Sequence, residues 1–334
     1  MLEATPMRIV ALEEHVSLAP FNAELEAGAP ERRAGGGGAK RAELEDVEEL
    51  RLASMDASGI SIQVLSVPGP GASILAPEAA PSFAQRYNDE LAAIVARHPA
   101  RFAAFAHLPM TAPQAAADEL DRAVRERGLV GAMISGQTRG KFLDDPSFEP
   151  LLARAEALDV PIYIHPGIPP DAVRKAYYDG FSPHVSSLFA TAGWGWHAET
   201  AVHVLRMVLG GTFDRHPRLK IIIGHMGEGL PTMLARCDDF LSQKTTGLPR
   251  TVSQTILDHV TITLSGFFSQ PPFLAALLTF GVDRMLFSVD YPFSDNAIMR
   301  AFLDALPIAP DDKIKIAHGN ADRLLKLKAE RVPA

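Results

Sequence analysis

Short apolar runs alternate with longer amphipathic stretches along almost the whole chain. The apolar runs are mostly continuous, which is typical of strands buried on both faces of a parallel sheet. They predict strands at residues 7–15, 60–67, 101–108, 129–135, 160–165, 219–225, 260–265 and 285–290. The stretches between them have helical periodicity. They predict helices at residues 43–58, 77–98, 113–127, 148–158, 198–209, 230–244, 273–280, 297–306 and 310–325.

Repeated β/α units in 334 residues predict a (β/α)8 barrel of the TIM type, formed as a single domain over residues 1–334. A doubly wound open sheet is the alternative. No G-x-G-x-x-G sequence follows the first predicted strand, which counts against a dinucleotide-binding version of that fold.

Two long segments are predicted to be irregular. Residues 17–42 contain Gly35-Gly36-Gly37-Gly38, and we expect a flexible lid loop there. A tolerated surface insertion is the alternative. Residues 171–196 are rich in aromatic residues, and we expect an aromatic insertion beside the pocket.

Residues suited to metal binding or proton transfer stand at the ends of several predicted strands. The first strand ends in Glu13-x-His15, and regular alternation along a strand would put both side chains on one face. Later strands end in His165, His225 and Asp290. Active sites of these barrels lie at the carboxyl ends of the strands, so we expect the side chains to converge.

Four of these positions predict a metal centre with two imidazole and two carboxylate ligands: Glu13, His15, His165 and Asp290. This donor set suits one Zn²⁺ or Mn²⁺ ion with an open position for substrate. His225 and Glu228 are three residues apart at a strand-to-helix turn. There Glu228 can fix the tautomer of His225, while His225 orients a ligand or donates to substrate.

Composition narrows the class of protein. The chain is 47% hydrophobic and 22% charged, as is usual for a soluble globular enzyme. Its net charge of -8 and scattered basic residues argue against nucleic-acid binding. No signal peptide or membrane-spanning apolar run is recognisable, and the single cysteine, Cys237, excludes an intrachain disulfide. We therefore expect a cytoplasmic enzyme with no membrane partner.

Short motifs in a fixed order carry a family resemblance over nearly the whole chain. They are Ala11-Leu12-Glu13-Glu14-His15, Met55–Ile60, Arg101-Phe102, Leu108-Pro109, Pro161–Pro166, Glu199–His203, Phe213–Pro217, Gly224–Pro231, Phe287–Phe293 and Asn320-Ala321. With these motifs the sequence resembles the amidohydrolase-related decarboxylases of hydroxybenzoates. That group includes the γ-resorcylate, 2,3-dihydroxybenzoate and 5-carboxyvanillate decarboxylases.

The resemblance implies a set of residue roles. The four predicted ligands would bind one divalent metal ion, and His225 and Glu228 would complete the catalytic network. Arg236 matches an arginine that reaches the substrate of a neighbouring subunit, which implies a homodimer or homotetramer. Arg51 matches an arginine on the substrate side.

The implied reaction is nonoxidative decarboxylation of a hydroxylated benzoate-type acid, with release of CO2. Metal-dependent hydrolysis of an amide, ester or lactone is the alternative, since the wider superfamily consists mostly of hydrolases, commonly with His-x-His on the first strand. Glu13-x-His15 is the variant associated with decarboxylases. Val130–Ile134 offers no lysine to bridge two metals, so one ion is expected. Gly266-Phe267-Phe268 and Trp194-Gly195-Trp196 depart from the benzoate decarboxylases and leave the ring substituents of the substrate open.

Overall fold

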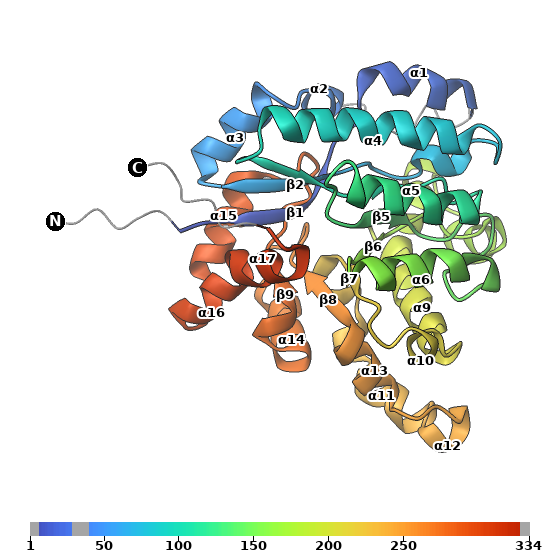
Figure 1. Cartoon of the computed structure of the whole chain (residues 1–334). Coiled ribbons are helices and arrows are strands. Elements are labelled where there is room, and N and C mark those ends of the chain that lie inside the picture. The colour runs from blue at the N-terminus through green and yellow to red at the C-terminus, as the bar shows by residue number, and fades with distance from the viewer. Residues whose placement is uncertain (1–6, 29–39, 328–334) are drawn as a thin grey trace.

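Parallel strands lie at the centre of the molecule and helices surround them (Figure 1). The computed structural model describes residues 7–28 and 40–327. Its strands are β1 (Val10–His15), β2 (Ile62–Ser66), β3 (Phe102–Ala104), β4 (Ala106–His107), β5 (Ala132–Ser135), β6 (Ile162–His165), β7 (Ile221–Ile223), β8 (Val260–Thr263) and β9 (Met285–Leu286). Neighbours in the chain pair in parallel, in the orders β1-β2-β3 and β4-β5-β6-β7-β8-β9.

Backbone hydrogen bonds join the two groups of strands at both edges. β3 and β4 are parts of one predicted strand interrupted at Phe105, whose N–H donates to the carbonyl of Leu65 (2.9 Å). At the other edge Leu12 forms a parallel bridge with Ser288, and the His15 N–H donates to the carbonyl of Tyr291 (2.7 Å). The last strand therefore meets the first, as in the predicted barrel.

Helices connect the strands and cover their outer side. They are α1 (Ala19–Gly28), α2 (Arg41–Glu45), α3 (Leu50–Ser58), α4 (Ala80–Arg97), α5 (Pro113–Arg125), α6 (Glu149–Leu158), α7 (Asp171–Val173), α8 (Pro183–Ala190), α9 (Gly195–Leu209), α10 (Thr212–Arg215), α11 (Leu234–Phe240), α12 (Gln243–Thr246), α13 (Val252–His259), α14 (Gln270–Phe280), α15 (Asn296–Ala305), α16 (Pro310–Ile314) and α17 (Asn320–Leu325). The predicted helices 43–58 and 230–244 are interrupted, whereas residues 310–325 are helical throughout, with a π-helical turn at Lys315–Gly319. Within the described residues no helix combines the length and apolar character needed to cross a membrane.

The segment expected to be an irregular lid loop begins with a helix. Residues 19–28 form α1, so the prediction of irregular structure is wrong there. Good helix formers such as Glu24 and Leu25 favour this conformation, and Phe21 anchors it, with its ring centroid 4.7 Å from that of Tyr87 on α4. Gly35–Gly38 lie outside the described residues, and the lid stays a prediction.

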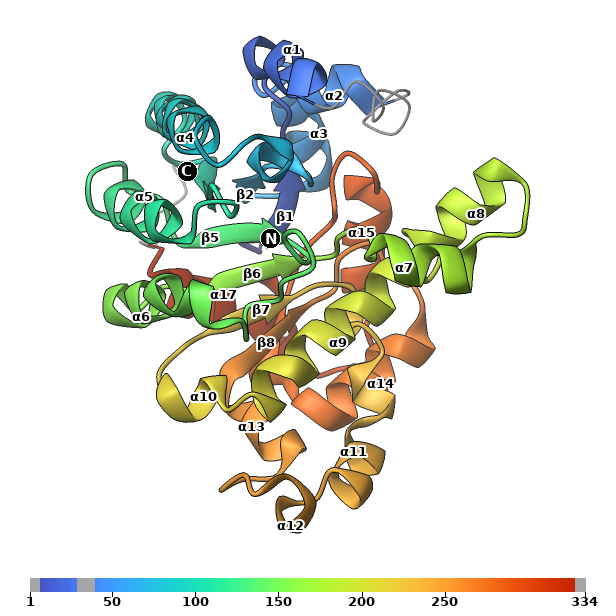
Figure 2. The same cartoon turned by 90° about the vertical axis from the view of Figure 1, so that its right-hand side faces the viewer.

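The segment of residues 171–196, called here the aromatic segment, is also largely helical, contrary to the prediction. It contains α7, a π-helical turn at Arg174–Tyr178, α8 and the first residues of α9. The hydroxyl of Ser182 accepts from the N–H of Val185, and Pro183 follows in the first turn, so α8 has a favourable amino-terminal cap. α7 and α8 extend away from the barrel at the right of Figure 2. Tyr177 and Trp194 are exposed.

Candidate metal centre and active site

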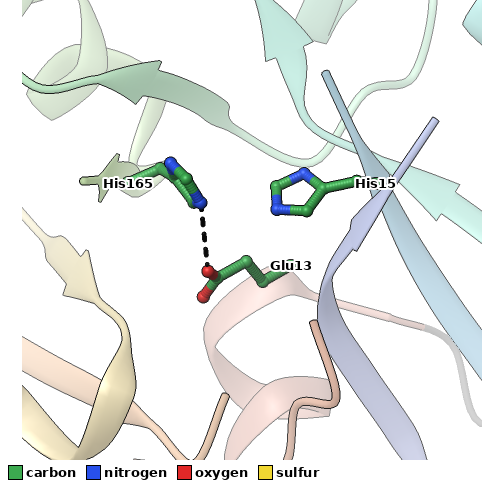
Figure 3. Close-up of side chains that lie close together, drawn as sticks. All are labelled: Glu13, His15 and His165. Carbon is green, nitrogen blue, oxygen red and sulfur yellow. Dashed lines mark ion pairs between the residues drawn. The ribbon is translucent and has the colours of Figure 1, made fainter. Parts of the chain in front are cut away.

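The predicted metal ligands meet at one end of the barrel. Glu13 and His15 lie at the end of β1 and His165 at the end of β6, with their polar groups facing a common space (Figure 3). Glu13 Oε1 is 3.3 Å from His165 Nε2, and His15 Nε2 is 3.3 Å from Asp290 Oδ1. His225 joins them, with its Nε2 atom 3.5 Å from Glu13 Oε1.

Unusual backbone conformations direct two of these carboxylates. Glu13 has a φ of 63° and Asp290 a φ of 72°. The register between β1 and β2 also shifts between Ala11 and Glu14, as in a β-bulge. Positive φ values at non-glycine residues are unfavourable and gather at functional sites. Glu13 therefore reaches the site through a local distortion, and simple alternation along the strand does not describe its direction.

The donor atoms fit a divalent cation. Glu13 Oε1 and Asp290 Oδ1 are buried without a hydrogen-bond partner among the described residues. An unpaired buried carboxylate oxygen is costly, and a cation between these oxygens would satisfy both. Burial lowers the pKa values of His15 and His165 to about 4, which favours the neutral imidazoles that metal binding requires.

Neighbouring groups fix the direction of the ligands. His165 Nδ1 is 2.8 Å from the carbonyl of Pro166, and His15 Nδ1 is 3.1 Å from the hydroxyl of Ser66. Both rings therefore present Nε2 to the centre. The hydroxyl of Tyr163 donates to Glu13 Oε2. Tyr163 was not among the predicted site residues, although it lies two residues before His165 and alternation along β6 places both on one face.

The predicted pair of His225 and Glu228 is formed and has a second imidazole attached. His225 Nδ1 is 2.7 Å from Glu228 Oε1, and His197 Nδ1 is 2.5 Å from Glu228 Oε2. Burial opposes charge on His225, but Glu228 and Glu13 outweigh it and raise its pKa to about 10. Burial likewise opposes charge on Glu228, yet His225 and His197 hold its pKa below the usual value. His197 was not among the predicted site residues, and its signal in the sequence is the distinctive Trp194-Gly195-Trp196 run just before it.

Asp290 combines a ligand position with a perturbed acidity. Burial raises the pKa of its carboxyl group to about 7, although His225 and His197 act in the opposite direction. A carboxyl group with a pKa near neutrality can hold and release a proton at physiological pH. Its position beside His15 makes it both a candidate ligand and a candidate proton donor.

The two predicted substrate arginines lie in different surroundings. Arg51 on α3 is fully buried, and its guanidinium donates to the carbonyl of His15 and to Gln63 Oε1 (3.0 Å). Arg51 therefore supports the end of β1 through its hydrogen bond to the backbone of His15. A contact of Arg51 with substrate stays a prediction. Arg236 on α11 is exposed and lies over the ring of Phe240, 3.8 Å from its centroid. A contact of Arg236 with another subunit stays a prediction.

Glu14 links the end of β1, which carries Glu13 and His15, to the segment around Asp290. Its Oε1 atom accepts from the N–H of Val289 (2.9 Å), and its Oε2 atom accepts from the N–H of Tyr291 (3.3 Å) and from Gln63 (3.2 Å). Val289 and Tyr291 flank Asp290. The side chain of Glu14 thus holds the backbone around Asp290 against β1.

Glu14→Gln is expected to lower kcat by roughly 10-fold to 100-fold, the range typical of groups that support metal ligands. Both oxygens of Glu14 now accept hydrogen bonds from N–H groups. Glutamine would replace one of these oxygens with an NH2 group, which cannot accept, so at least one of the donors would lose its acceptor. Glu119→Gln is the matched control, because Glu119 is a buried carboxylate bound by Asn88 and Arg122 on another part of the barrel. Thermal unfolding and steady-state kinetics of both variants check this. Equal loss of kcat in both would show that only general destabilisation is at work.

Comparisons with known proteins identify the family of this chain. A family model described as Amidohydrolase matches residues 15–327. The chain is 40% identical over 296 residues to the gamma-resorcylate decarboxylase of Rhizobium radiobacter, covering 85% of this chain and 88% of that protein. It is 38% identical over 335 residues to the decarboxylase orsB of Emericella nidulans, covering 97% and 98%.

The fold is also similar to that of a solved decarboxylase structure. The dihydroxybenzoic acid decarboxylase of a Polaromonas species, crystallised with manganese and the inhibitor 2-nitroresorcinol, has a TM-score of 0.86 and 34% identity, covering 96% of this chain and 97% of that chain. These findings confirm the predicted resemblance and the predicted (β/α)8 fold class. With its match over residues 15–327, this chain belongs to the amidohydrolase family.

Proposed function

We propose that this protein decarboxylates an aromatic acid with a hydroxyl group ortho to the carboxylate, without oxidation, and releases CO2. One divalent ion, Zn²⁺ or Mn²⁺, would be held by Glu13, His15, His165 and Asp290. The observation that carries the proposal is a pair of buried carboxylate oxygens, Glu13 Oε1 and Asp290 Oδ1, with no hydrogen-bond partner among the described residues. Each lies 3.3 Å from an imidazole nitrogen, that of His165 and that of His15 respectively. Since the named relatives are decarboxylases, the predicted enzyme class, a carboxy-lyase, is confirmed.

The chain's own residues supply the remaining chemistry. A bound metal ion acts as a Lewis acid toward oxygen atoms of a substrate. Asp290 would protonate the ring carbon that carries the carboxylate, forming a C–H bond. Cleavage of the C–C bond then returns its electron pair to the ring and expels CO2. His225, whose Nε2 atom faces the same space as Glu13, would donate to the phenolate oxygen.

Aromatic side chains line the approach to these groups. The ring centroid of Phe293 is 5.7 Å from that of His15, and the ring centroid of Phe267 is 5.9 Å from that of His225. Trp196 lies 6.3 Å from His165 by the same measure. These rings would hold an aromatic substrate and exclude water from the reacting carbon.

We also propose that the protein forms a homodimer or homotetramer. Arg236 is exposed, and Met233 and Phe240 on the same part of the chain are also exposed. A second copy that covered them would bring a guanidinium to the neighbouring site, where it could pair with a peripheral oxygen of the substrate. A cytoplasmic location likewise stays a proposal, based on the single cysteine.

A metal-replete assay against a panel of hydroxybenzoates tests the proposed function. CO2 release and the ring product are followed together, with and without chelator. Turnover of an ortho-hydroxy acid that stops on chelation is the expected result. If no acid releases CO2, while an amide, ester or lactone is cleaved with uptake of water, the hydrolase alternative replaces the proposal.

A further inference from the structure

We propose that His197 is a positioning residue, which fixes Glu228 and through it the orientation of His225. The inference deepens the proposed function and rests on it for the reaction affected. It assigns a role to the aromatic segment, whose carboxyl end leads directly into His197.

A continuous set of polar contacts runs from the aromatic segment to the active site. His197 Nε2 is 3.1 Å from the carbonyl of Ala192, and its Nδ1 atom is 2.5 Å from Glu228 Oε2. Glu228 Oε1 is in turn 2.7 Å from His225 Nδ1. Because the carbonyl and the carboxylate are both acceptors, each nitrogen of His197 donates in this arrangement. His197 is thereby held at one end and holds Glu228 at the other.

Glu228 needs such support because its backbone is strained. His225, Met226 and Glu228 have φ values of 49°, 57° and 56°, all in the left-handed region. The turn that carries them is therefore not fixed by a regular strand or helix. The two imidazoles hold one carboxylate oxygen each, so the direction of the carboxylate depends on both. Loss of His197 would leave a fully buried Glu228 oxygen without its donor.

The ring of Phe267 packs against the imidazoles of both His197 and His225. Its ring centroid lies 5.6 Å from that of His197 and 5.9 Å from that of His225, and the two imidazoles are 4.8 Å apart. Packing alone could thus account for the presence of a ring at position 197. The experiment must separate the donated hydrogen bond from the packing.

His197→Asn and His197→Phe form a matched pair for this purpose. Asparagine keeps an N–H donor near the position of Nδ1 but loses the ring, whereas phenylalanine keeps the ring but loses the donor. We expect His197→Phe to lower kcat by roughly 10-fold to 100-fold with little change in KM or in bound metal, as for other groups that orient a catalytic residue. We expect His197→Asn to keep kcat within about fivefold of the wild-type value, since a hydrogen-bond donor to Glu228 is retained.

Two outcomes would overturn the proposal. One is a His197→Phe protein with wild-type kcat, and the other is a His197→Asn protein as impaired as His197→Phe. Better activity of the phenylalanine variant would assign His197 to packing.

A readout independent of turnover separates this inference from the proposed function. In protein labelled with ¹⁵N-histidine and loaded with diamagnetic Zn²⁺, the Nδ1–H signal of His225 reports its hydrogen bond to Glu228. We expect this signal to be retained in His197→Asn and to shift or broaden in His197→Phe. An unchanged signal in His197→Phe refutes the positioning role even if no substrate has been found. Absence of decarboxylation in the wild-type protein, with the expected NMR result, refutes only the proposed function.

Discussion

Asp290→Asn is expected to lower the rate of decarboxylation by at least about 100-fold, because removal of a positioned general acid typically costs 10²- to 10⁴-fold. Asparagine keeps the size of the side chain and a carbonyl oxygen near the centre. It has no carboxyl proton to give to the ring carbon. The loss should therefore appear in kcat even in protein that contains one equivalent of metal, which elemental analysis of the assayed sample measures.

Asp295→Asn provides the matched control for this variant. Asp295 lies five residues further on, outside the candidate site, and caps α15 by accepting from the N–H groups of Ala297 and Ile298. Asparagine caps helices equally well, so wild-type kinetics are expected. Full activity of Asp290→Asn in metal-replete protein would sink the proposed mechanism. If metal content and activity fell in parallel, Asp290 would be a ligand only.

The barrel and most of its candidate ligands could be predicted because both depend on local patterns. Continuous apolar runs mark parallel strands, and a parallel barrel brings the ends of all its strands to one side. The position of His165 in the candidate site could be predicted from its place at the end of β6 alone. The identity of the ligand-type residues at these ends then limits the chemistry to a divalent metal.

The residues that escaped prediction depend on tertiary contacts. Leu50 is 50% exposed and the neighbouring Arg51 is fully buried, the reverse of what the polarity of the two side chains suggests. Burial of Arg51 is possible because the His15 carbonyl and Gln63 supply acceptors, which lie far from it in sequence. His197 was missed for the same reason, since its partner Glu228 is 31 residues away.

The register shift at Glu13 shows a different limit of prediction from sequence. Alternation along a regular strand predicts that Glu13 and His15 share one face. Their polar groups do face a common space (Figure 3), but the structure reaches that arrangement through a register shift and a positive φ. Such a distortion is unfavourable by itself and persists only where surrounding contacts determine it. Hydrogen bonds of Glu14 to the N–H groups of Val289 and Tyr291 are among those contacts, and they cross the junction between the first and last strands.

Glu13→Gln is expected to weaken metal binding by more than about 100-fold, beyond the roughly 10-fold to 100-fold effect of groups that only support ligands. Glu13 is fully buried, with Oε1 near two imidazoles and Oε2 bound by the hydroxyl of Tyr163. Glutamine can keep a hydrogen bond to Tyr163 but has no negative charge to offer the cation. Calorimetric titration of metal-free protein with Zn²⁺ or Mn²⁺ measures the difference. Glu119→Gln, the same change at a buried carboxylate elsewhere, should bind as the wild type does.

Thermal stability gives a second test of Glu13→Gln. The substitution is expected to change stability in opposite directions in the metal-free and the metal-bound protein. The Glu13 Oε1 atom is buried with no hydrogen-bond partner among the described residues. Without metal, the cost of burying this carboxylate outweighs its attraction to His225, so Glu13→Gln should unfold at an equal or higher temperature. With metal at about 100 times its dissociation constant, the wild-type protein should gain about 2.7 kcal/mol of unfolding free energy, and the variant should gain much less. A structural carboxylate would behave differently, since its loss would destabilise both forms alike. The crossing of the two stabilities therefore identifies Glu13 as a residue kept for the metal ion at a cost to the metal-free fold.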